Sequence, residues 1–517
     1  MTFPKPSSES EPFPLTLTLS LGEREQPLST SAEFESLRAE SAYRFARKLG
    51  TFLPLPWGEG RGEGEAISFH REPRINFPGS LLQNFFILTF FLAAFLLAGC
   101  QTMHTQNSSS RPPVKLGDEV LFEKRLDLIR GKRVGLITNP TGLDSHLDSI
   151  IERFRACPDT KLVALYGPEH GVRGNAQAGE FVAYYYDEHF HLPVFSLYGQ
   201  THTPPPDMMT NIDEYMRTFD TKHEGKQVEA GMIESVDVMI FDLQDVGTRV
   251  YTYVGTMGNA MEAATKAGLP FIVLDRPNPI NGVAMEGPIL EYPEFSSFIG
   301  HYPIPLRHGM TTGEIAQFIN AKFLGGKCNL TVVKMENWTR DEWFDETSLP
   351  WTLPSPNLPT LESATVYPGQ VIVEGTNLSE GRGTTKPFEF FGAPWIDGYV
   401  LAKRLNGLNL PGVKFREVYF TPTFSKFSGT NCGGCQMYVT DRAKFNAVVT
   451  TLNILTEIKK VYGDKLELHK SYFDHVMGTS SVREAFERGE PVDKIVAAYQ
   501  PGLDEFAKTR EPYLLYR

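Results

Sequence analysis

Three short polar motifs of this chain bring together side chains that can perform acid–base or metal chemistry. The motifs are GPEHG with Glu169 and His170, DLQDVG with Asp242 and Asp245, and DRPN with Arg276 and Asn278. Carboxylates and imidazoles move protons and ligate metal ions, and guanidinium groups bind anions. Each motif directly follows an apolar run. One such motif would be an ordinary turn, but three of them at the ends of predicted strands indicate a functional site.

The elements that must position these motifs are predicted from apolar patterning. Strands are expected at 132–138, 161–166, 192–197, 236–241, 270–274 and 330–335, and helices at 146–154, 253–267 and 312–324. Near-continuous apolar strands that alternate with helices predict a doubly wound, mainly parallel α/β sheet covered on both faces. In such sheets the ligand binds outside the carboxyl ends of the strands, where the three motifs lie.

Several function classes are excluded by what the sequence lacks. No G-x-G-x-x-G follows the first strand and no G-x-x-x-x-G-K-[ST] occurs, so a dinucleotide or nucleoside triphosphate is not expected, and no cofactor is predicted. The absence of G-x-S-x-G argues against an α/β-hydrolase esterase. The net charge of −12 argues against nucleic acid as a partner.

The pattern of alternating strands and helices ends near position 340. We therefore expect a catalytic domain at 114–340 and a smaller α+β domain at 341–517. A proline-dense, linker-like run at 351–359 precedes a predicted strand at 370–374 and a glycine-rich loop at 375–385. Helices are expected at 396–405, 442–455 and 482–488, with a strand at 435–439. Cys432 and Cys435 are expected in a turn or a local disulfide. The glycine-rich loop is positioned to close over the crevice of the first domain.

The first hundred residues are predicted to be a leader. Residues 85–99 are uncharged and apolar, too short to span a bilayer comfortably but suited to a signal peptide. They end in LAGC, which resembles the bacterial lipobox, so Cys100 is expected to carry lipid and residues 101–113 to form a tether to a membrane of the cell envelope. The alternatives are a signal anchor or a short buried helix. Residues 1–75 have no helical period and suggest a misassigned start or a fused leader.

Longer motifs resemble one family, the NamZ-type exo-β-N-acetylmuramidases. They are YGPEHG at 166–171, DLQDVGTRVYTY at 242–253, LDRPNPING at 274–282, PIPLRHGMTTGE at 303–314, PSPNLPT at 354–360 and EGTNLSEGRGTTKPFE at 374–389. The resemblance covers about residues 115–517. It implies a Rossmann-like catalytic domain with a smaller auxiliary domain. It also implies a cell-wall hydrolase that removes terminal N-acetylmuramic acid from the non-reducing end of peptidoglycan fragments.

Glycoside hydrolysis needs a proton donor and usually a second carboxylate. Glu169 is the predicted acid, since it ends a buried strand where desolvation favours a protonated carboxyl group, and the family's glutamate maps to the same motif. Four carboxylates are candidates for the second role: Asp245 and Asp242 in one turn, and Glu374 and Glu380 beside the glycine-rich loop. Alternatively, the substrate's own 2-acetamido group supplies the nucleophile.

Substrate contacts are predicted from the chemistry of muramic acid, whose lactyl group carries a carboxylate. One of four arginines, Arg249, Arg276, Arg307 and Arg382, is expected to grip it. His170 and His308 are expected to bind sugar hydroxyls or Glu169, Asn278 and Asn377 to contact the sugar, and Tyr251 to stack on it.

Two other functions compete with this hypothesis. His170, Asp242, Asp245 and His308 would be a sufficient ligand set for a metal-dependent hydrolase, although no H-E-x-x-H occurs and no metal site is predicted. The chain would otherwise be a non-catalytic lipoprotein that binds cell wall. Release of free sugar from a muramic-acid-terminated disaccharide separates these functions.

Overall fold

The computed structural model describes residues 112–180, 182, 184–198 and 235–517. The predicted leader and its Cys100 therefore lie outside the described residues. Within the described ranges, no helix is both long enough and apolar enough to cross a membrane.

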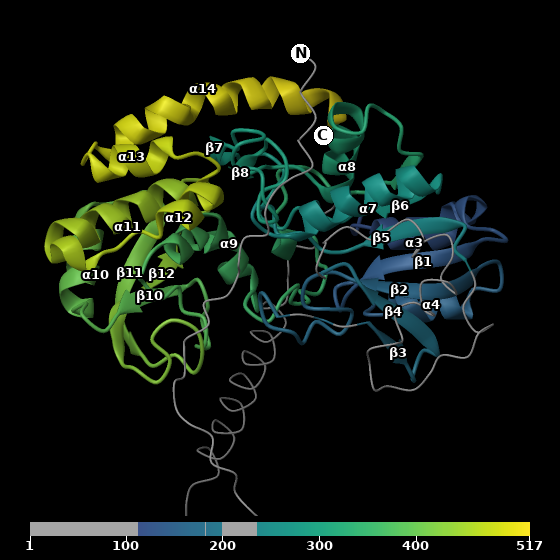
Figure 1. The fold of residues 1–517 in the computed structure, drawn as a ribbon, viewed down its shortest axis with the longest axis horizontal. Coiled ribbons are helices and arrows are strands. Elements are labelled where there is room, and N and C mark those ends of the chain that lie inside the picture. The colour runs from purple at the N-terminus through teal and green to yellow at the C-terminus, as the bar shows by residue number, and fades with distance from the viewer. Residues whose placement is uncertain (1–111, 181, 183, 199–234) are drawn as a thin grey trace, which may run out of the picture. The chain divides into compact units, whose positions relative to one another are not determined.

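A seven-stranded sheet dominates the N-terminal half of the described chain (Figure 1). Its order is β3-β4-β2-β1-β5-β6-β9. The strands are β1 (Arg133–Thr138), β2 (Lys161–Gly167), β3 (Tyr185–Asp187), β4 (Leu192–Ser196), β5 (Val238–Asp242), β6 (Phe271–Leu274) and β9 (Leu330–Val333). All neighbouring strands are parallel except β3 and β4. The prediction of a mainly parallel α/β sheet is confirmed.

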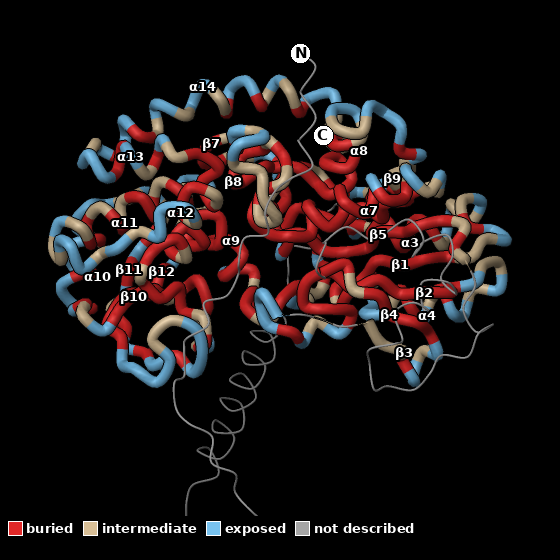
Figure 2. The backbone as a smooth tube through the Cα atoms, in the orientation of Figure 1, coloured by how far each residue is buried: buried red, intermediate tan, exposed pale blue. Residues whose placement is uncertain are grey.

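Helices cover both faces of this sheet because the strands are apolar on both sides. α3 (Gly117–Lys124) and α4 (Ile150–Ala156) pack on one face, and α7 (Tyr253–Ala267) and α8 (Thr312–Lys322) pack on the other. Consecutive β1 residues Leu136 and Ile137 belong to opposite clusters, as alternation along a strand requires. Figure 2 shows the strands buried between these helices.

The order of the central strands indicates where a ligand would bind. β1 pairs with β2 on one side and with β5 on the other, so the chain changes direction at β1. The loops that leave β1 and β5 then diverge toward opposite faces. In open α/β sheets, ligands bind outside the carboxyl ends of strands at this switch point.

The C-terminal part is built on a smaller antiparallel sheet, with the order β10-β12-β11. The elements are β10 (Phe390–Ala393), β11 (Val413–Phe420), β12 (Cys432–Val439), α10 (Gly398–Gly407), α11 (Ala447–Tyr462), α12 (Lys470–Met477), α13 (Ser481–Glu487) and α14 (Val492–Arg510). A hairpin of β7 (Glu286–Ile289) and β8 (Pro305–Arg307) packs against α14. The expected second α+β region is confirmed.

The two parts share one apolar core. A single buried cluster contains Met257 of α7 and Ile315 of α8 together with Leu452 of α11. α14 reaches back to the first part, where Phe506 lies 6.0 Å from Phe318 between ring centroids. Figure 1 shows α14 running above the β7–β8 hairpin. The loops of both parts are therefore held at fixed positions by side-chain packing.

The predicted strand at 370–374 is wrong. These residues are the end of α9 (Leu361–Gln370) and the following 3₁₀ helix η4 (Val371–Gly375). The Thr360 side chain caps α9 by accepting a hydrogen bond from the Ser363 amide at 3.3 Å. A short apolar run cannot by itself distinguish a strand from the buried end of a helix.

Two other expectations about the C-terminal part need correction. Cys432 and Cys435 are free thiols within β12, where they belong to different apolar clusters, rather than a turn or a disulfide. The proline-dense run 351–359 does not link separated domains. Its Pro354 carbonyl accepts a 2.6 Å hydrogen bond from the hydroxyl of Tyr253 at the start of α7, so the run packs on the carboxyl end of the large sheet.

Candidate active site

Glu169 lies two residues after β2 and is held by its own loop and by the loop that follows β5. One carboxylate oxygen accepts a hydrogen bond from the Thr252 hydroxyl at 2.7 Å, and the other accepts one from the Gly179 amide at 3.1 Å. Thr252 immediately precedes α7, so the carboxyl ends of β2 and β5 meet at this carboxylate. The side chain is only 8% exposed, and its two hydrogen bonds hold the carboxylate in a defined position.

His170 lies beside Glu169 but has a different set of contacts. Its backbone is left-handed, with φ of 72°, which turns the ring toward the following loop. Because a carbonyl only accepts, Nδ1 donates to the Ala176 carbonyl oxygen at 2.8 Å. Burial lowers the pKa of the imidazole; Glu169 opposes this effect and Arg382 adds to it. His170 is therefore a neutral ring whose Nε2 is free of the proton.

Asp245 and His308 form a buried pair in the loops after β5 and β8. His308 Nε2 lies 3.3 Å from Asp245 Oδ2, which also accepts a hydrogen bond from the Gly247 amide at 2.7 Å. His308 Nδ1 accepts a hydrogen bond from the Met310 amide, so Nε2 is the ring nitrogen that carries a proton toward Asp245. Asp245 Oδ1 has no hydrogen-bond partner among the described residues. His308 thus contacts Asp245 rather than Glu169.

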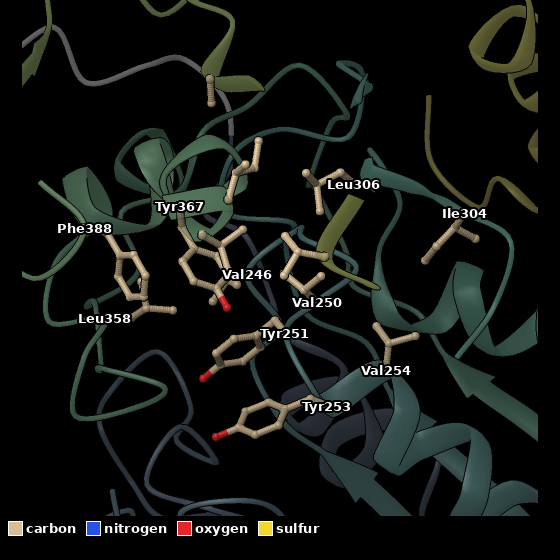
Figure 3. Close-up of a cluster of buried hydrophobic side chains, with 14 of the residues drawn as sticks. Val246, Val250, Tyr251, Tyr253, Val254, Ile304, Leu306, Leu358, Tyr367 and Phe388 are labelled. Carbon is tan, nitrogen blue, oxygen red and sulfur yellow. The ribbon is translucent and has the colours of Figure 1, made fainter. Parts of the chain in front are cut away.

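Aromatic rings connect the two parts of the chain at this site (Figure 3). Tyr251 packs edge-on against Tyr253 at 4.6 Å between centroids and lies 6.1 Å from Tyr367 of α9. Tyr367 in turn contacts Phe388 at 4.7 Å. Tyr251 is 6% exposed, so its ring faces are used mainly in this packing.

The glycine-rich loop supplies a cluster of charged residues from the C-terminal part. Arg382 donates from Nε and Nη2 to Glu374 Oε1 at 3.1 and 2.8 Å, and its Nε lies 3.5 Å from Glu380. Glu374 Oε2 accepts from the Tyr472 hydroxyl at 2.9 Å. The Arg382 guanidinium lies over the Phe388 ring at 5.0 Å. The loop is thereby linked to Tyr367 and the first part.

Asp242 and Arg276 form a separate buried ion pair. Arg276 donates to both carboxylate oxygens of Asp242 at 2.6 and 2.8 Å, and it also donates to the Leu143 carbonyl at 3.0 Å. Burial lowers the pKa of Arg276, but the Asp242 and Asp118 carboxylates raise it above the ordinary value. The pair joins the loops after β1, β5 and β6.

Four other predicted residues are used in contacts inside the protein and do not join the Glu169 group. Arg249 donates to the carbonyls of Pro288, Ile304 and Val476, and burial lowers the pKa of its guanidinium to about 9. Arg307 pairs with Glu286 at 2.6 Å and donates to the Ile280 carbonyl. Asn278 binds Met310 and Ile280, and Asn377 binds the backbone of Lys465 and Glu467. Spacing in sequence could not reveal these partners.

Sequence reasoning missed several residues of the site. Thr252 and Gly179 bind Glu169, and Asn139 donates to the Tyr253 hydroxyl at 2.7 Å. Asn139 follows β1 at the switch point, so its position after the first strand was an available signal. Tyr367 had no such signal, because α9 reaches the site only through tertiary packing.

The four residues considered as metal ligands do not converge. Asp242 pairs with Arg276, whereas Asp245 contacts His308, and His170 binds the Ala176 carbonyl. In the part of the chain that the structure describes, no group of three or more His, Cys, Asp or Glu side chains could hold a metal ion.

Known proteins share both the sequence and the fold. Two family models match, "Exo-beta-N-acetylmuramidase NamZ, N-terminal" at 134–225 and 215–362, and the corresponding "C-terminal" model at 365–516. Peptidoglycan beta-N-acetylmuramidase NamZ of Bacillus subtilis is 48% identical over 433 residues, which cover 82% of this chain and 98% of that protein.

Two crystal structures from Bacteroides fragilis, of a family first designated a domain of unknown function, have the same fold. They have TM-scores of 0.68 and 0.59 at 37% and 28% identity, and the matches cover 79% and 78% of this chain and 100% and 99% of those chains. The motifs and the fold agree with these matches, and the chain belongs to the NamZ family of exo-β-N-acetylmuramidases.

Proposed function

We propose that this chain releases terminal N-acetylmuramic acid from the non-reducing end of peptidoglycan fragments, with Glu169 as the general acid. The relative from Bacillus subtilis and both family models support the reaction. The observation that carries the assignment of Glu169 is its place among the loops. It lies at the carboxyl end of β2 and accepts hydrogen bonds from Thr252 and Gly179.

The contacts of Glu169 suit proton transfer. The Gly179 amide holds one oxygen and leaves the second with Thr252. A hydroxyl both donates and accepts, so the contact with Thr252 is compatible with the acid before and after it protonates the leaving oxygen. Such a donor at the glycosidic oxygen contributes about 10²–10⁴-fold to the rate.

Asp245 is the second carboxylate of the proposed mechanism. Asp242 is bound by Arg276 through both oxygens, and Glu380 is bound by Lys426 at 3.2 Å and Arg382. Oδ1 of Asp245 has neither a hydrogen-bond partner nor an ion-pair partner among the described residues, whereas Oε2 of Glu380 lacks a hydrogen bond but is paired with Lys426. The proton of His308 Nε2 faces the other oxygen of Asp245 at 3.3 Å.

Arg382 is the arginine that we assign to the lactyl carboxylate. All four arginines are bound within the protein, Arg249, Arg276 and Arg307 by carbonyls or carboxylates and Arg382 by Glu374 through Nε and Nη2. The Nη1 group of Arg382 forms no hydrogen bond with the described residues and is the group that we assign to the substrate. Arg382 is near enough to His170 to lower the pKa of that imidazole, which supports a position beside the Glu169 group. A bidentate contact would give discrimination for muramic acid over N-acetylglucosamine.

The decisive experiment is a turnover assay on two disaccharides. Purified protein is expected to release free N-acetylmuramic acid when this sugar is the non-reducing residue, and to release nothing when N-acetylglucosamine takes that place. The same assay with a chelator tests the metal-dependent alternative, which predicts loss of activity. Absence of release from both disaccharides would refute the proposed function and favour a binding protein.

We further propose that the protein is lipid-anchored through Cys100 in the bacterial cell envelope, on the periplasmic side of a membrane. The apolar run 85–99 and the LAGC sequence support this location. Cys100→Ala should move the protein from the membrane to the soluble fraction and leave turnover of small disaccharides unchanged. A wild-type protein that is already soluble after fractionation would contradict the anchor.

A further inference from the structure

Lys426 is a charged side chain beside the glycine-rich loop that the proposed mechanism does not use. It lies in the connection between β11 and β12, and four oxygen atoms surround its ammonium group. The ammonium donates to the carbonyls of Val373, Glu374 and Leu378 at 3.2, 3.2 and 3.0 Å. The fourth oxygen, Glu380 Oε2, lies 3.2 Å from the same nitrogen. Lys426 therefore binds both the backbone and a buried carboxylate of this segment.

The connection between β11 and β12 contacts the glycine-rich loop at a second place. The amide and the hydroxyl of Thr423 both donate to the Gly383 carbonyl, at 2.9 and 3.0 Å. Gly383 has a φ of 78°, and a Cβ at this position would lie 2.5 Å from the Phe424 carbonyl oxygen. Only glycine allows so close an approach. The two loops are thus held together by contacts that do not involve the charge of Lys426.

Four ionic groups meet in this cluster, the carboxylates of Glu374 and Glu380 and the cations of Arg382 and Lys426. Their charges cancel. The Glu380 side chain is only 3% exposed, and its Oε2 has no hydrogen bond among the described residues. A buried ion is tolerated only when an opposite charge or hydrogen bonds replace its water. For Glu380, the ion pairs with Lys426 and Arg382 supply this compensation.

The distances divide the two carboxylates between the two cations. Arg382 donates from Nε and Nη2 to Glu374 Oε1 at 3.1 and 2.8 Å, whereas Glu380 Oε1 lies 3.5 Å from Nε. Glu374 is thus the close partner of Arg382, and Lys426 is the closer cation of Glu380. Burial lowers the pKa of Arg382, but the two carboxylates raise it above the ordinary value, so the guanidinium stays charged. Its Nη1 remains available because Lys426 neutralises the second carboxylate.

We propose that Lys426 is the residue that keeps Arg382 able to bind an anion. It neutralises Glu380 and so leaves Nη1 of Arg382 for the lactyl carboxylate of the substrate. Without this ammonium group, the cluster carries one excess negative charge, which repels an incoming carboxylate. Lys426 acts through Glu380 and Arg382, so it is a positioning residue that sets the affinity for the charged sugar. This inference rests on the proposed function, in which Arg382 is the lactyl contact.

The test compares two variants that both lack the ammonium group. Lys426→Met removes the charge and keeps a long apolar side chain. The double variant, Lys426→Met with Glu380→Gln, also removes the carboxylate charge, so the charges of the cluster cancel again. Both variants leave the same three backbone carbonyls without the lysine. Any difference in affinity between them therefore reports the charge and not the lost hydrogen bonds.

Calorimetry measures the affinity for N-acetylmuramic acid and for its neutral lactyl carboxamide. Lys426→Met is expected to lose about 10-fold in affinity for the acid and nothing for the carboxamide, and the double variant to recover to within about threefold of wild type. With the disaccharide, the loss should appear in KM and not in kcat. Lys414→Met, which changes an exposed lysine of β11, is the matched control and should alter neither affinity.

Glu380→Gln alone provides an independent test in which Lys426 keeps its backbone contacts. This variant gives the cluster one excess positive charge, so it should bind the acid about 3- to 10-fold more tightly than wild type and the carboxamide equally well. Unchanged affinity for the acid in this variant would contradict the inference, whether or not the methionine variants fold.

Three further results would overturn the inference. They are an equal loss of affinity for acid and carboxamide in Lys426→Met, a double variant as weak as the single one, and a double variant that binds normally but has lost kcat. The first two would make Lys426 a structural tie, and the third would make Glu380 a reacting carboxylate. Failure of the proposed function is distinguishable, since wild-type protein would then release no N-acetylmuramic acid from the disaccharide.

Discussion

Two groups of charged residues lie near the carboxyl ends of the same parallel strands, yet they are completed in different ways. In the paired group, Arg276 binds both oxygens of Asp242 at 2.6 and 2.8 Å. In the open group, which comprises Glu169, Asp245 and Tyr251, the Oδ1 atom of Asp245 and the hydroxyl of Tyr251 have no hydrogen-bond partner among the described residues. The first group is complete within the protein, whereas the second group offers unused donors and acceptors to a ligand.

The physical reason for this difference is the cost of burying charge. A buried ion is tolerated only when an opposite charge or hydrogen bonds replace its water. Motif residues such as Arg276, Arg307 and Arg249 meet this condition through internal partners and so stabilise the loops. Residues with unused hydrogen-bonding capacity are better candidates for function. By this criterion the structure divides the motif residues into the paired group and the open group.

The largest effect is expected from the open group. Glu169→Gln should lower kcat by about 10²–10⁴-fold, because the amide keeps the hydrogen-bonding shape but cannot protonate the leaving oxygen. Circular dichroism should show an intact fold. Glu362→Gln, an exposed glutamate of α9, is the matched control. Retention of more than about a tenth of the wild-type kcat would sink the assignment of Glu169 as the acid.

The paired group should respond in stability instead. Arg276→Ala leaves the buried Asp242 uncompensated and should reduce the free energy of unfolding by about 3–5 kcal/mol in urea titrations. The double variant Arg276→Met with Asp242→Asn should lose less, since neither charge remains unpaired. A single variant with wild-type stability and a selective loss of substrate binding would instead place Arg276 in the open group.

Arg382 tests whether the glycine-rich loop belongs functionally to the open group. Arg382→Ala should lower kcat/KM by about 10- to 100-fold for the lactyl-bearing sugar, through loss of a charge-assisted contact. Arg382→Lys should recover only part of this, because an ammonium cannot bind a carboxylate bidentately. Discrimination is measured as the ratio of kcat/KM for the two disaccharides. An unchanged ratio in both variants would exclude Arg382 as the lactyl contact.

The smallest expected effect concerns Asp118, beside the paired group. Burial raises the pKa of this carboxyl from 3.8 to about 7, so its stabilising contribution is fully present below about pH 4 and is lost as the pH rises through 7. Asp118→Asn should therefore gain stability relative to wild type between pH 5 and pH 8. Parallel profiles of unfolding free energy against pH for the two proteins would contradict this.

Much of the fold could be predicted because its signals are local. Each strand of the large sheet is a continuous apolar run, and α7 occupies the predicted residues 253–267, since helical periodicity lies within a single window of sequence. The same reasoning failed at 370–374, where the apolar residues end α9, because burial in a helix and in a strand leaves the same short pattern.

The sequence by itself determined the α/β class, the motifs at the strand ends and, through those motifs, the family. Only the tertiary structure decided which charges are paired within the protein, because Asp242 meets Arg276 from 34 positions away and Arg249 meets Val476 from 227. It also decided that Tyr367 of α9 packs against Tyr251 of the first part. Hydrogen-bond partners depend on distances between elements that only packing fixes, whereas periodicity depends on neighbours along the chain.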